Sequence, residues 1–169
     1  MNDLNDPKCK RFFRNCDEFS LCVNIGESGY VISEHPNERY TIFYYGVYGS
    51  GKFGRIFDPN PITLDANKKE IADVQDYVND RVSFASDSDF FLIGFNTLDK
   101  DVKWAYKIIT SNDDDFVFGS KKTFIVCLDG NPIVNNKKLK RYDYSQIYSN
   151  KEYNLNMNDK DVLGIFYIL

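Results

Sequence analysis

The stretch from Gly46 to Lys52 has the G-x-x-x-x-G-K spacing of a phosphate-binding loop. In that motif a hydroxyl residue follows the lysine and ligates magnesium, but Phe53 occupies the position here. The loop must also open a helix whose N-terminal amides hold the phosphate, and Gly54, Pro59 and Pro61 prevent a helix from beginning there. We therefore interpret the glycines as a chain reversal between two β-strands.

The sequence offers few residues for metal or nucleophilic chemistry. It contains one histidine, His35, and four cysteines that form no C-x-x-C pair, so a structural zinc site lacks its usual ligand spacing. It contains no G-x-S-x-G nucleophile elbow. Cys127 lies between Val126 and Leu128 in an apolar run and is predicted to be a reduced core residue. We expect no bound transition metal, no cofactor and no assignable catalytic residue.

The elements that position these residues are predicted to be β-strands. Short β-branched and aromatic runs alternate with Gly, Asn and Asp turns, a pattern typical of an all-β sandwich or barrel. At most one short helix is expected, over 66–78, where Ile71, Val74 and Val78 repeat at helical spacing, with a strand or a loop as the alternative. The predicted strands include 40–48, 89–96, 115–118 and 123–129.

An internal repeat is one interpretation of the chain's organisation. The triplet Asn-Lys-Lys begins at Asn67 and again at Asn136, and Gly94 and Gly164 each follow an acidic turn and an apolar pair. Coincidence in a chain rich in asparagine and lysine is the alternative. We therefore expect one domain over 1–169, with two internal halves at about 19–96 and 103–169 as a hypothesis.

Charge and hydropathy limit the classes of partner. The 169 residues are 43% hydrophobic and carry a formal net charge of -4, whereas binding to nucleic-acid phosphates needs a concentrated basic face. No segment approaches the roughly 18 apolar residues that a membrane span requires, and the N-terminus lacks the apolar region of a signal peptide. We expect a cytoplasmic protein that binds neither nucleic acid nor membrane.

From Phe124 onward an apolar run ends at Gly130 and is followed by Asp143, Ile147 and Tyr153. In this order of residues the chain resembles the second half of a cupin domain. Cupins show an apolar strand ending in glycine, then a G-D-x-x-x-I-P-x-G-x-x-H motif. Gly130 matches the strand-ending glycine, Asp143 the motif's aspartate and Ile147 its isoleucine, while Tyr153 falls where the family places its last metal-binding histidine. The resemblance implies a cupin-like jelly roll, or double-stranded β-helix.

The same resemblance indicates candidate ligand-binding residues and argues against metal. His35 and Glu38 lie in a His-Pro-x-Glu run that resembles an eroded first cupin motif, and Tyr142, Asp143 and Tyr153 lie in the second motif. A neutral phenol is a poor substitute for an imidazole on a divalent metal, so the resemblance implies a metal-free cupin. A single histidine in a turn is also commonly a surface hydrogen-bonding residue.

Two classes of function stay open. The first is a non-catalytic binding or structural accessory protein of the kind that phages encode, located in the host cytoplasm or the virion. The second is a metal-independent isomerase or epimerase acting on a sugar or another small polar substrate, with His35 and either Asp143 or Tyr153 as a dyad. A His35 side chain that faces a cavity beside another ionisable group favours the enzyme.

The C-terminal strand indicates self-association. Nearly every residue from Val162 to Leu169 is apolar, so both faces of this strand need burial. One face can pack inside a barrel, and we expect the other to be covered by a second copy of the chain in a dimer, because an open apolar strand invites pairing. Burial by the N-terminal segment, with Phe12, Phe13 and Phe19, is the alternative.

Overall fold

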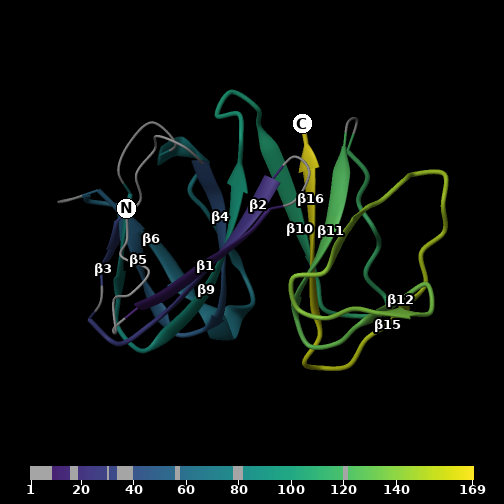
Figure 1. Ribbon diagram of the computed structural model, residues 1–169, viewed down its shortest axis with the longest axis horizontal. Coiled ribbons are helices and arrows are strands. Elements are labelled where there is room, and N and C mark those ends of the chain that lie inside the picture. The colour runs from purple at the N-terminus through teal and green to yellow at the C-terminus, as the bar shows by residue number, and fades with distance from the viewer. Residues whose placement is uncertain are drawn as a thin grey trace. The chain divides into compact units, whose positions relative to one another are not determined.

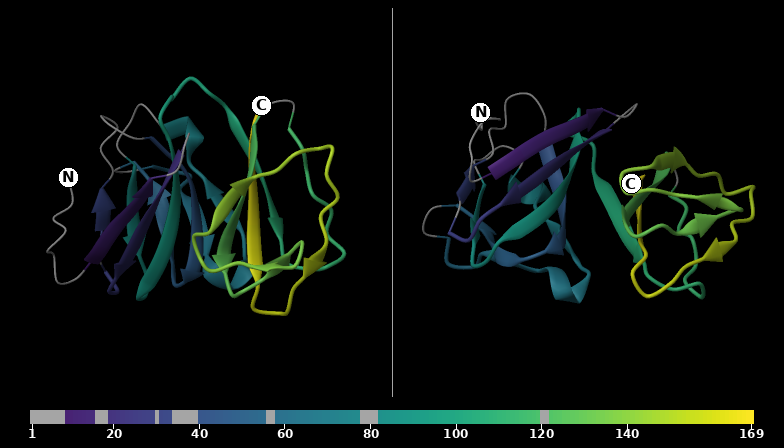
Figure 2. Two further views of the ribbon diagram at one scale, coloured as in Figure 1. Left: turned by 45° about the vertical axis from the view of Figure 1, so that its right-hand side comes forward. Right: turned by 60° about the horizontal axis from the view of Figure 1, so that its bottom comes forward.

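A computed structural model describes residues 9–15, 19–29, 31–33, 40–55, 58–77, 82–119 and 122–169, with the backbone alone described for 9–15 and 31–33. Two predicted site residues, His35 and Glu38, lie outside these ranges, as do the side chains of Phe12 and Phe13. The chain divides into two compact units, Met1–Asp101 and Val102–Leu169. Both units consist of β-strands (Figure 1 and Figure 2).

The first unit contains two antiparallel sheets. The five-stranded sheet has the order β1-β2-β9-β4-β7, and the four-stranded sheet has the order β3-β8-β5-β6. Their strands are β1 (Cys9–Asn15), β2 (Phe19–Gly26), β3 (Val31–Ser33), β4 (Tyr40–Tyr48), β5 (Ser50–Gly54), β6 (Ile62–Asp65), β7 (Ile71–Asp73), β8 (Ser83–Ser86) and β9 (Phe90–Thr97). Residues from both sheets form one buried hydrophobic cluster, so the core of this unit draws on the two sheets together.

The second unit is built in the same way on a smaller scale. Its four-stranded sheet has the order β10-β16-β11-β14, and its three-stranded sheet has the order β13-β12-β15. Their strands are β10 (Trp104–Ile109), β11 (Thr123–Asp129), β12 (Ile133–Val134), β13 (Lys137–Lys138), β14 (Tyr144–Gln146), β15 (Leu155–Asn156) and β16 (Val162–Ile168). The C-terminal strand β16 pairs with β10 on one side and β11 on the other, so it is an internal strand of its sheet.

The all-β fold class is confirmed, but the helix expected over 66–78 is wrong for the described residues. This stretch forms two short 3-10 turns, Ala66–Lys68 and Gln75–Tyr77, on either side of β7. The Asp65 side chain accepts a bond from the backbone N–H of Asn67, and Lys69 ends the first turn with φ of 50°. Strand β7 then pairs with Phe43–Tyr45 of β4. This pairing with a distant strand decides the conformation of residues 71–73, although their apolar residues are spaced as in a helix. Among the described residues, no helix has the length and apolar character needed to cross a membrane.

The strand orders of the two units correspond in part, as β2-β9-β4-β7 and β10-β16-β11-β14, and the internal repeat stays a prediction. In each unit the last long strand, β9 or β16, lies between two antiparallel neighbours. Gly94 faces Cys22 and Tyr44 of the interior cluster, whereas Gly164 faces Phe166 and Leu128, which are not part of the second unit's interior cluster. The Asn-Lys-Lys triplets also differ, since the first lies at the 3-10 turn after β6, whereas the second begins in the turn after β12 and continues as β13.

Candidate functional site

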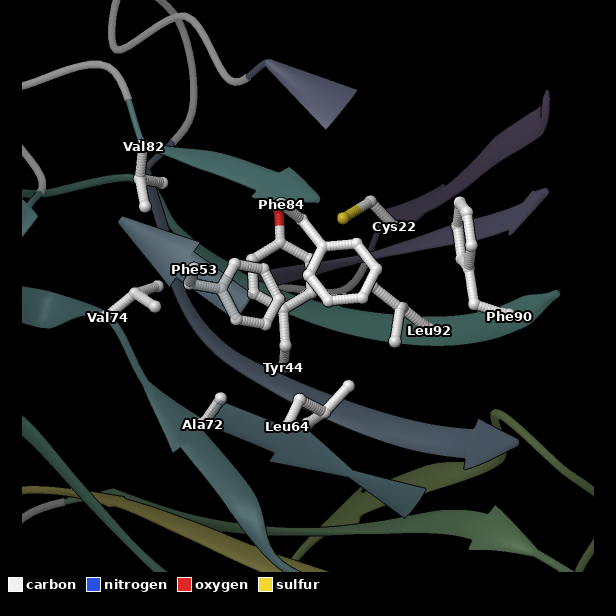
Figure 3. Close-up of a cluster of buried hydrophobic side chains, with 10 residues drawn as sticks. All are labelled: Cys22, Tyr44, Phe53, Leu64, Ala72, Val74, Val82, Phe84, Phe90 and Leu92. Atoms are coloured by element: carbon white, nitrogen blue, oxygen red, sulfur yellow. The ribbon is translucent and has the colours of Figure 1, made fainter. Parts of the chain in front are cut away.

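The interior of the first unit is filled by a run of aromatic rings (Figure 3). The Tyr44 ring stacks on Phe53 with centroids 4.6 Å apart, and Phe53 contacts Phe84 at 4.6 Å. The Phe84 and Phe90 rings pack edge to face, with centroids 5.3 Å apart. All four side chains are fully buried. With this close packing, the protein's own side chains fill the space between the two sheets.

Beside these rings lies a row of buried, uncharged polar side chains. Asn96 Oδ1 accepts a bond from Thr41 Oγ1 at 2.6 Å and a longer one from Cys22 Sγ at 3.7 Å. Asn96 Nδ2 donates to Ser20 Oγ at 3.3 Å, and Asn24 Nδ2 donates to Cys22 Sγ at 3.8 Å. Because these groups are hydroxyls, amides and a thiol, the row supplies hydrogen bonds but no carboxylate or imidazole for proton transfer.

An open pocket of about 520 Å³ lies in the first unit. Its lining is entirely polar apart from one glycine, and consists of Gly49, Ser50, Asp65, Asn67, Ser88 and Asp89. Backbone N–H groups already hold part of this lining: Ser50 N donates to Ser88 Oγ at 3.1 Å, and Ser28 N donates to Asp89 Oδ1 at 2.9 Å. The remaining hydroxyl, amide and carboxylate groups suit a small polar molecule.

The glycines of the phosphate-loop pattern have structural roles at this pocket. Gly49 has φ of +96° between β4 and β5, and a Cβ there would lie 2.4 Å from Asp89 O. A Cβ on Gly51 would lie 2.4 Å from Ala85 O and 2.5 Å from the Phe84 ring. Strands β4 and β5 lie in different sheets and pair in turn with β9 and β8, so the predicted strand reversal is wrong. Gly49 instead bends a continuing strand from one sheet into the other.

A second polar contact in the first unit escaped the sequence analysis. The Tyr77 hydroxyl donates to Asp58 Oδ2 at 2.8 Å, and the Arg55 guanidinium lies 5.5 Å from the centre of the Tyr77 ring. Hydrogen bonds from the Asn60 backbone and from Tyr77 lower the pKa of Asp58, while the bond to Asp58 raises the pKa of Tyr77. These contacts fasten the segment after β5 to the second 3-10 turn.

Of the predicted site residues, Tyr142 and Asp143 lie together in a turn of the second unit. Tyr142 has φ of 76°, and its backbone N–H donates to Cys127 O at 2.8 Å. Asp143 O accepts from Cys127 N at 2.8 Å, and its carboxylate accepts from Lys140 N at 2.8 Å. Burial raises the pKa of the Tyr142 phenol. Both residues thus have structural contacts, and their ligand-binding role stays a prediction.

Tyr153 packs into a different part of the second unit. Its hydroxyl accepts a bond from Tyr148 N at 2.8 Å, and its ring lies against the hydrophobic cluster. Phe116 stacks on the ring at 4.7 Å, and Phe118 lies 6.1 Å away. This contact could not be predicted from the sequence, because the segment with Phe116 and Phe118 was expected to pair as a strand and forms none.

Cys127 is confirmed as a buried core residue. Burial raises the pKa of its thiol to about 12, with negative charge at Asp143 adding to the effect. Its Sγ lies 3.6 Å from Asp129 O, to which it donates. A thiol with such a high pKa remains neutral at physiological pH and is a poor nucleophile.

Nearby, Asp161 is a buried carboxylate with a structural role. It accepts bonds from Asn131 N at 2.8 Å and Asn158 N at 2.9 Å, which join the start of β16 to the loop after β11. Asp129 forms an ion pair with Arg141. Across the residues that the structure describes, no three histidine, cysteine, aspartate or glutamate side chains gather in a group that could hold a metal ion.

Comparison with known proteins supports the fold and leaves the activity open. No protein-family model and no curated protein matches the sequence. A conserved protein of unknown function from Pseudomonas aeruginosa superposes with a TM-score of 0.62 at 7% identity, over 89% of this chain and 80% of that one. The bacterial pirin YhhW from Escherichia coli, in complex with nickel(II), superposes with a TM-score of 0.50 at 9% identity, over 100% of this chain and 88% of that one.

A cupin 2 conserved barrel domain protein from Leptotrichia buccalis gives a TM-score of 0.48 at 10% identity, over 98% of this chain and 92% of that one. At these identities, structural likeness concerns the fold alone. The predicted all-β class is confirmed by the strands of both units, and the TM-scores of 0.62 and 0.50 show that the fold is shared with the Pseudomonas aeruginosa protein and the pirin.

Proposed function

We propose that this protein is a metal-free, cupin-like protein with a non-catalytic binding or structural accessory role. The observation that carries the proposal is the aromatic packing of Tyr44, Phe53, Phe84 and Phe90 between the two sheets of the first unit. A barrel that acts on a substrate in its interior needs open space lined by polar groups. Here aromatic rings occupy that interior, which favours a role in stability.

The chemistry of the neighbouring side chains supports the same proposal. Ser20, Thr41 and Asn96 are neutral at every ordinary pH, and they satisfy one another through hydrogen bonds. General acid–base catalysis needs a group that titrates near the working pH and lies within hydrogen-bond reach of the substrate. Hydrogen bonding within a buried polar row instead fixes the pairing of β2, β4 and β9.

The predicted small polar or sugar ligand fits the open pocket better than either barrel interior. Asp65, Asp89 and Asn67 present carboxylate and amide groups, and Ser50 and Ser88 contribute hydroxyls. Carboxylates and amides of this kind can accept and donate bonds to sugar hydroxyls. We therefore propose this pocket as the place where such a ligand would bind.

The predicted dimer and the predicted source also belong to this proposal. Both edges of β16 are paired within the second unit, so a dimer contact through this strand has to use a face of its sheet. A phage origin, with the host cytoplasm or the virion as location, rests on the high content of asparagine, lysine, tyrosine and isoleucine.

The proposal is tested by incubating the protein with a panel of monosaccharides and following the sugar and protein signals by NMR. We expect no conversion of any sugar, and we expect binding, where it occurs, to shift backbone amides around Asp65 and Asp89. The variant carrying Asp65→Asn and Asp89→Asn should lose those shifts, whereas His35→Ala should keep them. Sugar turnover that disappears in His35→Ala would instead establish the metal-independent isomerase or epimerase.

A further inference from the structure

We propose that residues 115–118 form a strap over one face of the Tyr153 ring, and that a molecule carrying a planar aromatic ring binds to this face when the strap opens. The inference goes beyond the proposed function, because it concerns the second unit and holds whether or not the polar pocket of the first unit binds a ligand.

The strap is attached at its two ends and lacks backbone hydrogen bonds in its middle. Just before the strap, Asp114 Oδ2 accepts a hydrogen bond from Thr110 N at 3.0 Å. In the first residue of the strap, Asp115 O accepts one from Lys107 Nζ at 2.8 Å. After it, Gly119 N donates to Thr123 Oγ1 at 3.0 Å. No hydrogen bond joins residues 116–118 to any other residue that the structure describes. Figure 1 shows this irregular connection between β10 and β11.

Aromatic contacts are what hold the middle of the strap against the second unit. Phe116 stacks on Tyr153 with centroids 4.7 Å apart and planes 29° from parallel, while Phe118 lies at 6.1 Å. Both phenyl rings are only partly buried against the hydrophobic cluster. A segment with few buried contacts and no backbone bonds opens more readily than a paired strand.

The Tyr153 ring, by contrast, is fixed in place. Its hydroxyl accepts from Tyr148 N, and both of its chain neighbours are bonded to Asn135. Asn135 Nδ2 donates to Glu152 O at 3.2 Å, and Asn135 Oδ1 accepts from Asn154 N at 2.7 Å. Opening of the strap therefore leaves an ordered aromatic platform beside an apolar cluster.

The two phenyl rings that lie against Tyr153 indicate which class of ligand could take their place. Two phenyl rings already lie against Tyr153, one stacked and one tilted, so the site accommodates planar apolar rings in the geometry that aromatic pairs prefer. The strap and such a ligand compete for the same ring face. The apparent dissociation constant is consequently the intrinsic one divided by the fraction of molecules in which the strap is open.

The test is an NMR titration of the full chain with indole, which is planar and apolar. We expect weak binding to the natural protein and binding at least about tenfold tighter for the variant carrying Phe116→Ala and Phe118→Ala, because the competing rings are gone. The shifted amides should lie near Tyr153. Tyr106→Ala, which removes a partly exposed aromatic ring elsewhere in the second unit, is the matched control and should bind as the natural protein does.

Adding Tyr153→Leu to the double variant should abolish the tighter binding while far-UV circular dichroism remains that of a folded β-protein. Equal affinities in the natural protein and the double variant, or tight binding that survives Tyr153→Leu, would overturn the proposal. If the double variant does not fold, Phe118→Ala alone carries the same expectation with a smaller gain. Failure of both to fold would show that the strap is part of the core and would equally refute the proposal.

Discussion

Replacing Phe84 by alanine should strongly destabilise the protein, because this ring lies at the centre of the aromatic packing in the first unit. Phe84 is 1% exposed and contacts Phe53 at 4.6 Å and Phe90 at 5.3 Å. Phenylalanine-to-alanine changes in cores typically cost about 3–5 kcal/mol, and loss of two aromatic pairs places this site at the upper end. Since whole domains are stable by only about 5–15 kcal/mol, a loss of about 4–5 kcal/mol is readily measured.

The assay is urea unfolding followed by far-UV circular dichroism, with Phe84→Leu as the control. Leucine keeps most of the apolar volume, so it should cost only about 1–2 kcal/mol. Trp104, the single tryptophan, lies in the second unit, and its fluorescence provides a separate record of that unit. If Phe84→Ala costs less than about 1 kcal/mol, the interior contains unused space and the argument against an interior ligand site fails.

Three further changes test other parts of the structure. Gly51→Ala should lower the melting temperature markedly, since its Cβ would meet Ala85 O at 2.4 Å and the backbone would have to move; an unchanged melting temperature would refute this packing. Asp161→Asn should cost about 1.5–3 kcal/mol in urea unfolding, because charge-assisted bonds from two backbone N–H groups are weakened; a neutral effect would argue against its burial. Burial raises the pKa of Cys127 from 9.0 to about 12, so the folded protein keeps a proton that the unfolded chain releases. Stability should therefore fall by up to about 1.4 kcal/mol per pH unit as pH rises above about 9, with a shallower fall in Cys127→Ala; equal slopes would contradict the assignment.

The strand pattern could be predicted because it depends on local sequence. Strands expected over 40–48 and 123–129 appear as β4 and β11 with the same bounds, and that expected over 89–96 appears as β9, shifted by one residue. Aromatic and β-branched runs bounded by turn residues carry this information directly.

The helix over 66–78 and the strand over 115–118 were wrong because their outcome depends on neighbours distant in sequence. Residues 71–73 complete the edge of the five-stranded sheet by pairing with β4, which no helical spacing reveals. Residues 115–118 find no partner strand and are held instead by Tyr153. Matching Gly94 with Gly164 by sequence likewise could not show which face of its strand each glycine occupies.

The candidate site was only partly accessible from the sequence. That the stretch is no phosphate-binding loop could be predicted from Phe53 and the following prolines. Why residue 51 has to be glycine could be explained only once the position of the Phe84 ring was known. The polar pocket joins residues from three separate segments of the chain, Ser50, Asp65 and Ser88 among them, and their proximity follows from the pairing of β5 with β6 and β8. Tyr153 was found through a family resemblance, while its aromatic partners were not.

The most direct test of the central claim is elemental analysis of untagged protein that has been equilibrated with iron, manganese, nickel and zinc and then freed of unbound metal. If the barrel interiors are structural cores without a metal site, every metal should be far below one equivalent per chain, and the melting temperature should not change. One equivalent of a transition metal, lost on His35→Ala and accompanied by a higher melting temperature, would contradict the account.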